Sequence, residues 1–390
     1  MARSIKILIV AGTRPEAVKL APVLRCLRRE PSRFRVRFCV TAQHRELLDA
    51  MLFDLRLKPD VDLDLMRPGQ SPGGLLSRVI AAMEAVLKRE RPDLLLVQGD
   101  TTSALGSALA AFNEKVPIGH VEAGLRSFDR ARPYPEESNR VLVDHLSTLL
   151  FAPTPLARRN LQREALEDGR IFVTGNTGID SLLWAADRPG DFRVPALRAL
   201  PAGAAVVAVT LHRRESFGGP LESVFRGLLK AVAERPELFL VYPVHPNTGV
   251  RSAARRLLRH PRILLTEPLG YLDFVRLMKR SDAVVTDSGG VQEEAPSLGK
   301  MVLVVREKTE RPEVLGGGRG RLIGVSEEAV LRALRSLRRA PPRAPRANPV
   351  GDGHAAERIV ESILYWAGRR TRRPRDFRRD GVPPARTAGA

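Results

Sequence analysis

The expected fold is decided by the stretch IKILIVAGTRPEAVKL, residues 5–20. Residues 5–12 form an apolar, β-branched run that is typical of a buried strand. Gly12 permits a tight turn because it has no Cβ. Pro15 suits the first turn of a helix, where a missing N–H costs nothing. We therefore predict a strand, a turn and a helix, which together begin a parallel α/β sheet.

Similar apolar runs recur along the rest of the chain. They cover residues 36–43, 93–100, 117–124, 148–154, 170–176, 204–212, 238–245, 262–268, 282–290, 300–305 and 321–325. Helical periodicity fills the intervals, as in residues 77–90. Alternation of strands and helices predicts parallel sheets that are covered by helices on both faces.

A seam divides this series of strands, which is too long for one sheet. Residues 187–204 contain three prolines and two glycines without strong periodicity. We therefore predict an α/β protein with two Rossmann-like domains facing a central cleft, residues 1–175 and residues 176–352. Residues 353–368 are expected to form an amphipathic helix that packs back on the N-terminal domain. Residues 369–390 are expected to form a basic disordered tail.

The charge of the chain raises the question of nucleic-acid binding. The 390 residues carry a formal net charge of +20, from 64 Lys and Arg against 44 Asp and Glu. However, eight of the arginines lie in residues 366–390, and aromatic residues make up 5% of the chain, which is few for stacking on bases. We expect no nucleic-acid partner, and binding to nucleic acid remains an alternative that rests on charge alone.

Composition also limits the cellular setting. No apolar run approaches the roughly 18–20 residues that a membrane-spanning helix needs. The two cysteines, Cys26 and Cys39, are too few for a disulfide framework or a CxxC metal site. The N-terminal residues lead directly into a strand rather than a signal peptide. We expect a cytoplasmic protein with no membrane partner and no metal.

Two predicted strand-to-helix turns carry groups that suit an anion. After the first strand, Arg14 and Lys19 flank a helix N-terminus, where N–H groups and the helix dipole favour negative charge. Later in the chain, SGGVQEE (288–294) places two glycines before a helical stretch and Glu294 on it, where a ribose hydroxyl could donate to its carboxylate. Arg311 is a further phosphate candidate. The alternative is a pair of ordinary turns with surface charges.

Three carboxylates stand at positions that favour proton transfer. Asp100 and Glu122 follow predicted strands, and Glu136 lies in a proline-bounded loop. Carboxylates are costly at such places unless they are paired or used. The alternative is a buried set of ion pairs with Arg126 and Arg140. Two histidines, His212 and His245, also end strands, where each could instead be a hydrogen-bonded structural residue.

A series of longer motifs resembles one family from about residue 5 to residue 365. The motifs are GTRPEAVKLAPV (12–23), TAQHRELLD (41–49), VQGDTTSALGSALAAF (97–112), PIGHVEAGLRS (117–127), PEESNRVLVDHLS (135–147), GNTGID (175–180), LHRRES (211–216), YPVHPN (242–247), TDSGGVQEEAPSLGK (286–300) and ERPEV (310–314). They resemble the non-hydrolysing UDP-N-acetylglucosamine 2-epimerases. The resemblance implies a glycosyltransferase-B-like fold and a homodimer that interconverts UDP-GlcNAc and UDP-ManNAc without NAD or metal. It also implies elimination of UDP to a 2-acetamidoglucal and re-addition, in a pathway of cell-surface polysaccharide synthesis.

The resemblance assigns residues to roles. The implied catalytic residues are Asp100, Glu122, Glu136 and His212. The implied substrate-binding residues are Arg14, Lys19, Asp100, Glu122, His212, Phe274, Ser288, Gly289, Gly290, Glu294 and Arg311. Phe274 is expected beside the uracil, and His212 is expected to support the leaving diphosphate. Which carboxylate removes the C2 proton and which returns it stays open.

Some positions depart from the family pattern. Leu269 replaces a glutamine that contacts uracil in some members, and residues 316–319 read Gly-Gly-Gly-Arg where Glu-Ala-Gly-Thr is common. Members that bind a second UDP-GlcNAc as an activator have a regulatory set that Gln43, His44, Glu136, Arg213 and His245 resemble. Glu46 and Gly69 stand where those members have Gln and Arg. We expect activation to be weak or absent.

Three alternative activities stay open, although the motifs favour the non-hydrolysing epimerase. A hydrolysing relative would release ManNAc and UDP. An epimerase could act on another UDP-2-acetamido sugar. A retaining glycosyltransferase on this scaffold would need an acceptor site, and the three carboxylates argue against it.

Overall fold

The computed structural model describes residues 3–42, 45–67, 69–211, 218–309, 315, 319–337 and 348–378. The chain divides into unit 1, formed by residues up to Ser181 together with Gly351–Arg378, and unit 2, formed by Leu182–Val350. These divisions differ by a few residues from the expected boundaries at 175 and 352. The first one falls inside helix α7 (Thr177–Ala186). Ser181, the last residue before this division, donates a hydrogen bond from its Oγ to the carbonyl of Val18 in unit 1.

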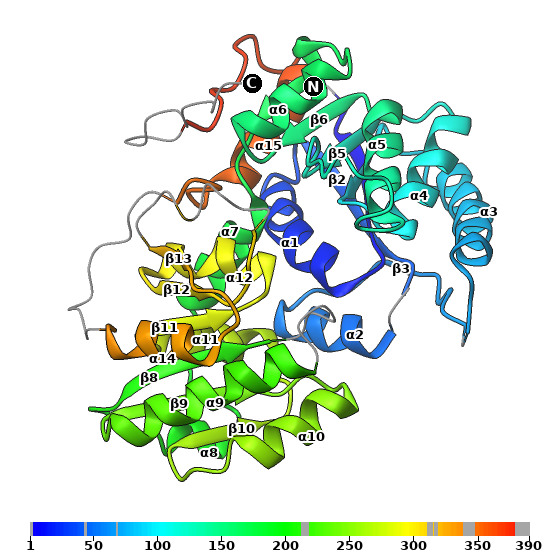
Figure 1. Ribbon diagram of the computed structural model, residues 1–390. Coiled ribbons are helices and arrows are strands. Elements are labelled where there is room, and N and C mark those ends of the chain that lie inside the picture. The colour runs from blue at the N-terminus through cyan, green and yellow to red at the C-terminus, as the bar shows by residue number, and fades with distance from the viewer. Residues whose placement is uncertain are drawn as a thin grey trace. The chain divides into compact units, whose positions relative to one another are not determined.

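Unit 1 contains a seven-stranded parallel sheet in the order β3-β2-β1-β4-β5-β6-β7 (Figure 1). Its strands are β1 (Ile5–Ala11), β2 (Phe34–Val40), β3 (Val61–Asp62), β4 (Leu94–Gln98), β5 (Ile118–Val121), β6 (Leu149–Ala152) and β7 (Ile171–Val173). The two-residue edge strand β3 was not predicted, because it has no apolar run of its own. The other six strands confirm the strand positions expected for this half of the chain.

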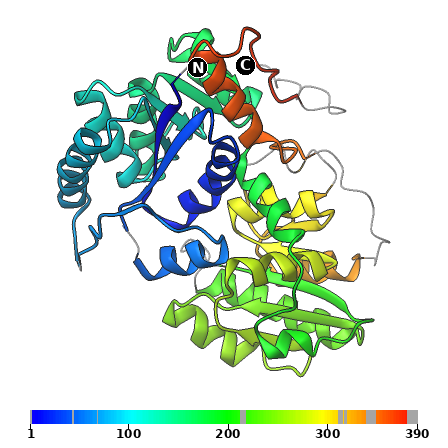
Figure 2. The ribbon, with the colours of Figure 1, turned by 180° about the vertical axis from the view of Figure 1, so that it is seen from behind.

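Helices cover both faces of this sheet. They are α1 (Arg14–Arg28), α2 (Arg45–Asp54), α3 (Pro72–Glu90), α4 (Thr102–Asn113), α5 (Glu136–Leu146), α6 (Pro155–Arg163), the 3₁₀ turn η1 (Asp168–Arg170) and α15 (Ala355–Trp366). Helix α1 packs against α2 and α15 on one face, while α3, α4 and α5 pack together on the other (Figures 1 and 2). Leu8, Val10, Leu95 and Val97 of the central strands form a core with Val79 of α3.

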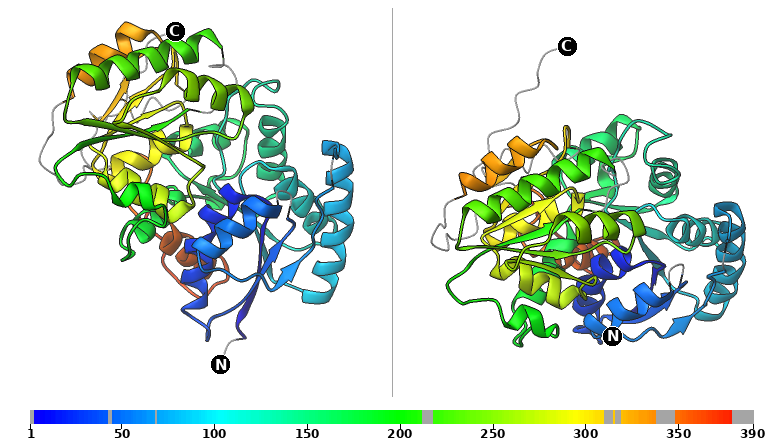
Figure 3. Two further views of the ribbon diagram at one scale, coloured as in Figure 1. Left: turned by 90° about the horizontal axis from the view of Figure 1, so that it is seen from below. Right: turned by 60° about the horizontal axis from the view of Figure 1, so that its bottom comes forward.

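Unit 2 contains a six-stranded parallel sheet in the order β10-β9-β8-β11-β12-β13. Its strands are β8 (Ala205–Thr210), β9 (Leu238–Pro243), β10 (Ile263–Thr266), β11 (Ala283–Thr286), β12 (Met301–Val304) and β13 (Gly320–Leu322). Its described helices are α8 (Pro195–Arg198), α9 (Gly219–Glu234), α10 (Thr248–Leu257), α11 (Tyr271–Arg280), α12 (Gly289–Glu294), the 3₁₀ turn η3 (Ala295–Leu298) and α14 (Glu327–Arg335). Helices α9 and α14 pack together on one face of the sheet, and α11 lies on the other (Figure 3).

Both sheets have a reversal of strand order at their centre. The strand order runs outward from β1 in one direction and from β4 in the other, and β8 and β11 repeat this arrangement in unit 2. In open parallel sheets, ligands bind beyond the carboxyl ends of the strands at such a switch point. The turns after β1, β4, β8 and β11 are therefore the places at which functional residues are expected.

The chain beyond α15 differs from the expectation of a disordered tail over its first ten residues. The backbone N–H of Phe377 donates to the carbonyl of Val173 at 2.7 Å, and Asp376 accepts from the N–H of Val173 at 3.1 Å. Phe377 is buried, and Asp376 also forms an ion pair with Arg158. Residues 369–378 are thus held against the edge of the unit 1 sheet at β7, while residues 379–390 lie outside the described part of the chain.

No helix in the described residues combines the length and the apolar composition that crossing a membrane would require.

Candidate functional site

The turn after β1 is shaped by the absence of a side chain at Gly12. A Cβ at this position would lie 2.2 Å from Ser103 Oγ and 2.6 Å from Thr41 Oγ1, and these two hydroxyls hydrogen-bond to each other at 2.8 Å. The backbone therefore approaches the start of α4 more closely than any other residue type would allow. Arg14, the first residue of α1, is exposed beside this turn.

A buried carboxyl group braces the same turn. Glu16 accepts hydrogen bonds from the N–H of Gly12 at 3.1 Å and from Thr101 Oγ1 at 2.9 Å. Burial raises the pKa of Glu16 from 4.5 to about 7, although these hydrogen bonds act in the opposite direction. Glu16 links the turns after β1 and β4, and sequence reasoning missed it. The only signal was an acidic residue directly after the helix-initiating Pro15.

Two of the three predicted carboxylates lie at strand ends and pair with cations. Glu122 follows β5 and forms an ion pair with Lys19 of α1, and both side chains are largely buried. Asp100 follows β4 and accepts from Arg140 Nε at 3.0 Å. The expected alternative of ion pairs with Arg140 is thus realised at Asp100, in the same place that the catalytic hypothesis requires. The pairs fix Asp100 after β4, at the switch point of unit 1, and Glu122 after the neighbouring strand β5.

Arg126, the other cation considered from the sequence, pairs elsewhere. It contacts the buried Asp144 at 2.7 Å and Glu164 at 2.7 Å, and it forms no described ion pair with Asp100, Glu122 or Glu136. The part of the alternative that placed Arg126 among the predicted carboxylates is therefore wrong.

The third carboxylate, Glu136, is the first residue of α5 and is half-buried. Its side chain forms no hydrogen bond or ion pair with any described residue. The neighbouring Glu137 is instead buried and accepts from the N–H groups of Ser127 and Phe128 at 3.0 and 2.9 Å. Glu137 anchors the loop that precedes α5, and this division of roles leaves Glu136 available for a ligand.

A buried histidine and aspartate join the two strand ends that carry Asp100 and Glu122. His120 Nε2 lies 2.8 Å from the carbonyl of Gly99, and its Nδ1 lies 2.6 Å from Asp144 Oδ1. Asp144 Oδ2 accepts from the N–H of Gly124 at 3.1 Å. Burial opposes ionisation of Asp144, but the contacts with His120 and Arg126 hold its pKa below the usual value. Neither residue was predicted as functional, since each could be an ordinary core residue in the sequence.

Unit 2 presents its predicted ligand residues in one continuous turn. β11 leads through Asp287 to Ser288, whose N–H is held by Thr286 Oγ1 at 2.9 Å. Gly289 and Gly290 begin α12, and no atom lies within 4 Å of a Cβ built at Gly290. Gly290 is exposed, with open space beside it. Glu294, the last residue of α12, is half-buried.

Other predicted residues of unit 2 lie on neighbouring elements. Phe274 is a half-buried residue of α11, and Leu269 precedes that helix. His245 Nδ1 accepts from the N–H of Asn247 at 3.3 Å. The buried Tyr242 donates its hydroxyl to the carbonyl of Leu211 at 3.0 Å and so fixes the end of β8.

Several predicted positions fall outside the described residues or side chains. These are Gln43, His44, the side chain of Glu46, His212, Arg213, Arg311 and residues 316–318. Gly69 is described: it is exposed, with φ +65° and no atom within 4 Å of a built Cβ. In the described part of the chain, no group of three or more His, Cys, Asp or Glu side chains could hold a metal ion.

One family model and several curated and solved proteins match most of this chain. Residues 26–364 match the family model described as UDP-N-acetylglucosamine 2-epimerase. A Yersinia pestis protein of that name is 46% identical over 371 residues, which cover 92% of this chain and 98% of the relative. The solved S. aureus MnaA–UDP structure is 41% identical, with a TM-score of 0.84 and coverage of 96% of this chain and 100% of that one. A Neisseria meningitidis UDP-GlcNAc 2-epimerase bound to UDP-GlcNAc is 38% identical, with a TM-score of 0.82 and coverage of 93% and 100%. With the two parallel sheets, these matches confirm the predicted α/β, glycosyltransferase-B-like fold.

Proposed function

The chain belongs to the UDP-N-acetylglucosamine 2-epimerase family, and we propose that it interconverts UDP-GlcNAc and UDP-ManNAc without hydrolysing either sugar nucleotide. The related Neisseria meningitidis structure is named as bound to UDP-GlcNAc, and the S. aureus structure contains UDP. These ligands support a uridine diphosphate sugar as the substrate of this chain.

The observation that carries the proposal is the pairing of carboxylates with cations after the adjacent strands β4 and β5 of unit 1. Lys19 holds Glu122, and Arg140 holds Asp100, while Glu136 lacks a described partner. Inverting the configuration at C2 requires one group that removes a proton and another that returns a proton to the opposite face. Asp100, Glu122 and Glu136, from three separate elements, are the candidates for these two roles.

The proposed reaction has two steps. In the first, a carboxylate accepts the C2 proton, the electrons of the C2–H bond form a C1=C2 double bond, and the C1–O bond breaks to release UDP. In the second, a diphosphate oxygen of UDP bonds to C1, and a carboxylic acid returns a proton to the other face of C2. The two steps together involve no net oxidation and consume no water.

We assign nucleotide binding to unit 2, and the family resemblance adds residues of the turn after β1. The amides of Gly289 and Gly290 suit a diphosphate, Glu294 suits ribose hydroxyls, and Phe274 suits the uracil ring. Ser288 is assigned to the same ligand by the family resemblance. Arg14, exposed beside that turn, adds positive charge for the diphosphate, whose departure develops negative charge. Lys19 is assigned to the substrate by the family resemblance, and in the structure its ammonium pairs with Glu122. His212 and Arg311 are assigned to the same ligand by the family resemblance alone.

Turnover of UDP-GlcNAc in deuterium oxide, followed by NMR, tests the proposal. We expect UDP-ManNAc to form and deuterium to enter C2 of both epimers. Free ManNAc with an equal amount of UDP as the final products would instead identify the hydrolysing alternative. Glu122→Gln should lower turnover by roughly 100-fold or more, as removal of an acid–base group does. Glu84→Gln, on the exposed face of α3, is the control and should match the unmodified protein.

We also propose that a second UDP-GlcNAc activates the enzyme weakly or not at all. Gly69 offers no cation at a position where activated relatives have arginine, and its surroundings are open. Hyperbolic UDP-GlcNAc kinetics, and turnover of UDP-ManNAc alone, are the expected results. Sigmoidal kinetics would contradict this proposal. A homodimer, which the family resemblance implies, is tested by light scattering.

A further inference from the structure

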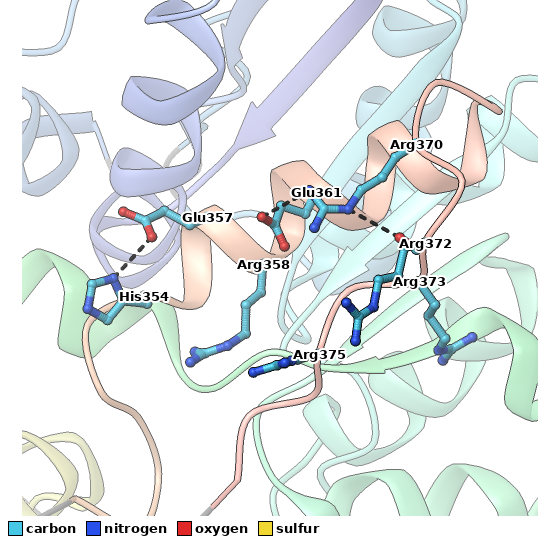
Figure 4. A pocket seen from close by; sticks show the side chains of 8 residues that line it. All are labelled: His354, Glu357, Arg358, Glu361, Arg370, Arg372, Arg373 and Arg375. Carbon is cyan, nitrogen blue, oxygen red and sulfur yellow. Dashed lines mark hydrogen bonds and ion pairs between the residues drawn. The ribbon is translucent and has the colours of Figure 1, made fainter.

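A cavity of about 390 Å³ lies beside α15 in unit 1 (Figure 4). It is lined by five arginines, namely Arg358, Arg370, Arg372, Arg373 and Arg375. They come from α15 and from residues 370–375, the segment that sequence reasoning had assigned to a disordered tail. None of the residues proposed above for catalysis or for nucleotide binding lines this cavity.

The carboxylates that line the cavity are already occupied. Glu361 forms an ion pair with Arg370 at 3.1 Å, and Glu357 lies 3.1 Å from His354 Nδ1 (Figure 4). Arg358 is held by both oxygens of Asp352 and by the carbonyl of Thr174. Glu361 and Asp352 therefore each neutralise one arginine of the cavity. Glu357 contacts a histidine, which is charged only when protonated, and forms no described ion pair with an arginine.

Three arginines of the cavity have no carboxylate partner among the described residues. Arg373 donates to the backbone carbonyls of Gly169 and Ile171, and its guanidinium lies 4.3 Å from the centre of the Phe172 ring. The exposed side chains of Arg372 and Arg375 form no described hydrogen bond or ion pair. Like charges close together repel, and the repulsion is relieved when an anion enters between them.

The segment that carries these arginines is held in place. Asp376 and Phe377 tie it to Val173 through the backbone and side-chain hydrogen bonds described above. Arg373 is fixed by the carbonyls, so its guanidinium is oriented before a ligand arrives. Among these three arginines, only the side chains of Arg372 and Arg375 must lose conformational entropy when an anion binds. Pre-organisation of this kind favours binding.

The chemistry of the lining selects the ligand. A guanidinium presents its donors in a planar fork that matches the oxygens of a phosphate group. The volume of the cavity is near the lower limit of small-molecule pockets. The eight lining side chains are all charged or histidine, so no apolar side chain is present to pack against a nucleotide base or a lipid tail. We propose that this cavity binds a compact, multiply charged phosphate anion, such as pyrophosphate or a small organic phosphate.

Calorimetric titration of the full chain with inorganic pyrophosphate tests the proposal. The test variant is Arg372→Ala with Arg375→Ala, because neither side chain has a described structural partner. The control is Arg29→Ala with Arg35→Ala, which removes the same charge from exposed positions of unit 1 that also lack described side-chain partners. We expect the test variant to lose one pyrophosphate site or to bind it at least about tenfold more weakly, as loss of two charged hydrogen-bond donors implies. The control variant should bind as the unmodified protein does.

Three outcomes would overturn the proposal. One is an identical isotherm for the test variant, which would place any pyrophosphate binding elsewhere, including at the proposed nucleotide site. Another is an equal loss in both variants, which would make the effect one of net charge. The third is that phosphatidylglycerol vesicles bind through Arg372 and Arg375 while pyrophosphate does not bind. This result would identify the headgroups of a membrane surface, rather than a free phosphate anion, as the ligand. Epimerase turnover is not the readout, so failure here is separate from failure of the proposed function.

Discussion

Replacing Asp144 with asparagine tests whether the buried contact between His120 and Asp144 positions the proposed catalytic carboxylates. Asparagine has nearly the same shape but lacks the charge that faces His120 and Arg126. Removing one partner of a buried ion pair costs about 3–5 kcal/mol in the free energy of unfolding. For a unit of roughly 200 residues, this loss corresponds to a decrease in Tm of roughly 10 °C.

The same change should also lower catalysis. His120 holds the carbonyl of Gly99, next to Asp100, and Asp144 holds the N–H of Gly124, two residues beyond Glu122. A displacement of about 1 Å in a catalytic group costs on the order of 100-fold in rate. We expect kcat for UDP-GlcNAc to fall by about this factor while KM changes little, because nucleotide binding is assigned to other elements.

Chemical denaturation and NMR turnover, measured on the same preparations, are the assays. Asp168→Asn is the matched control, since Asp168 forms an exposed ion pair with Arg158 that contributes below about 1 kcal/mol. Equal destabilisation by the two variants would refute the estimate for the buried pair. Destabilisation of Asp144→Asn with an unchanged kcat would refute the positioning role and leave His120 and Asp144 as structural residues only.

Three further predictions concern the interior of unit 1. Gly12→Ala should lower the free energy of unfolding by about 1–3 kcal/mol, because the added Cβ would overlap Ser103 Oγ. Gly73→Ala, where the added Cβ meets open space, is the control, and an equal effect of the two changes would contradict the packing explanation. Glu16 keeps its proton up to about pH 7 in the folded state but loses it near pH 4.5 in the unfolded state, so the free energy of unfolding should fall by about 3 kcal/mol as the pH rises from 4.5 to 7. Glu16→Gln should remove this decline in denaturation curves measured across that range. Cys39 is fully buried, and burial raises the pKa of its thiol to about 12, so a thiol reagent should modify the half-buried Cys26 before Cys39. Mass spectrometry measures the two labelling rates, and equal rates would show that the sheet opens readily.

Much of the fold could be predicted from the sequence because the signals were local. Apolar runs of strand length gave six of the strands in unit 1, and Pro15 marked the first helix. The edge strand β3 escaped prediction, since two residues carry no periodicity. The tail beyond residue 368 was misjudged because its composition is basic and contains proline, whereas its attachment depends on Asp376 and Phe377, whose partners lie some 200 residues away along the chain.

The candidate site was less predictable than the fold, because the partners of its side chains are far apart in the sequence. A carboxylate after a strand is visible in a sequence, so Asp100 and Glu122 could be selected. The partner of each carboxylate could not. The ion pair between Lys19 of α1 and Glu122 after β5 depends on the strand order β1-β4-β5, which spacing in the sequence does not show. Glu136 and Glu137 are adjacent acids with opposite environments, and only the position of the loop around Ser127 separates them.

Positive charge illustrates the same limit most clearly. Taken from the sequence, the arginines after residue 368 are an excess that solvent can screen, and their number says nothing about a ligand. In the folded chain, their meaning depends on which carboxylates reach them. Glu361 neutralises Arg370, while Arg372 and Arg375 face the same cavity without such a partner. The distinction between a solvated face and a binding site is therefore made by the pairing of individual charges, and net charge alone cannot supply it.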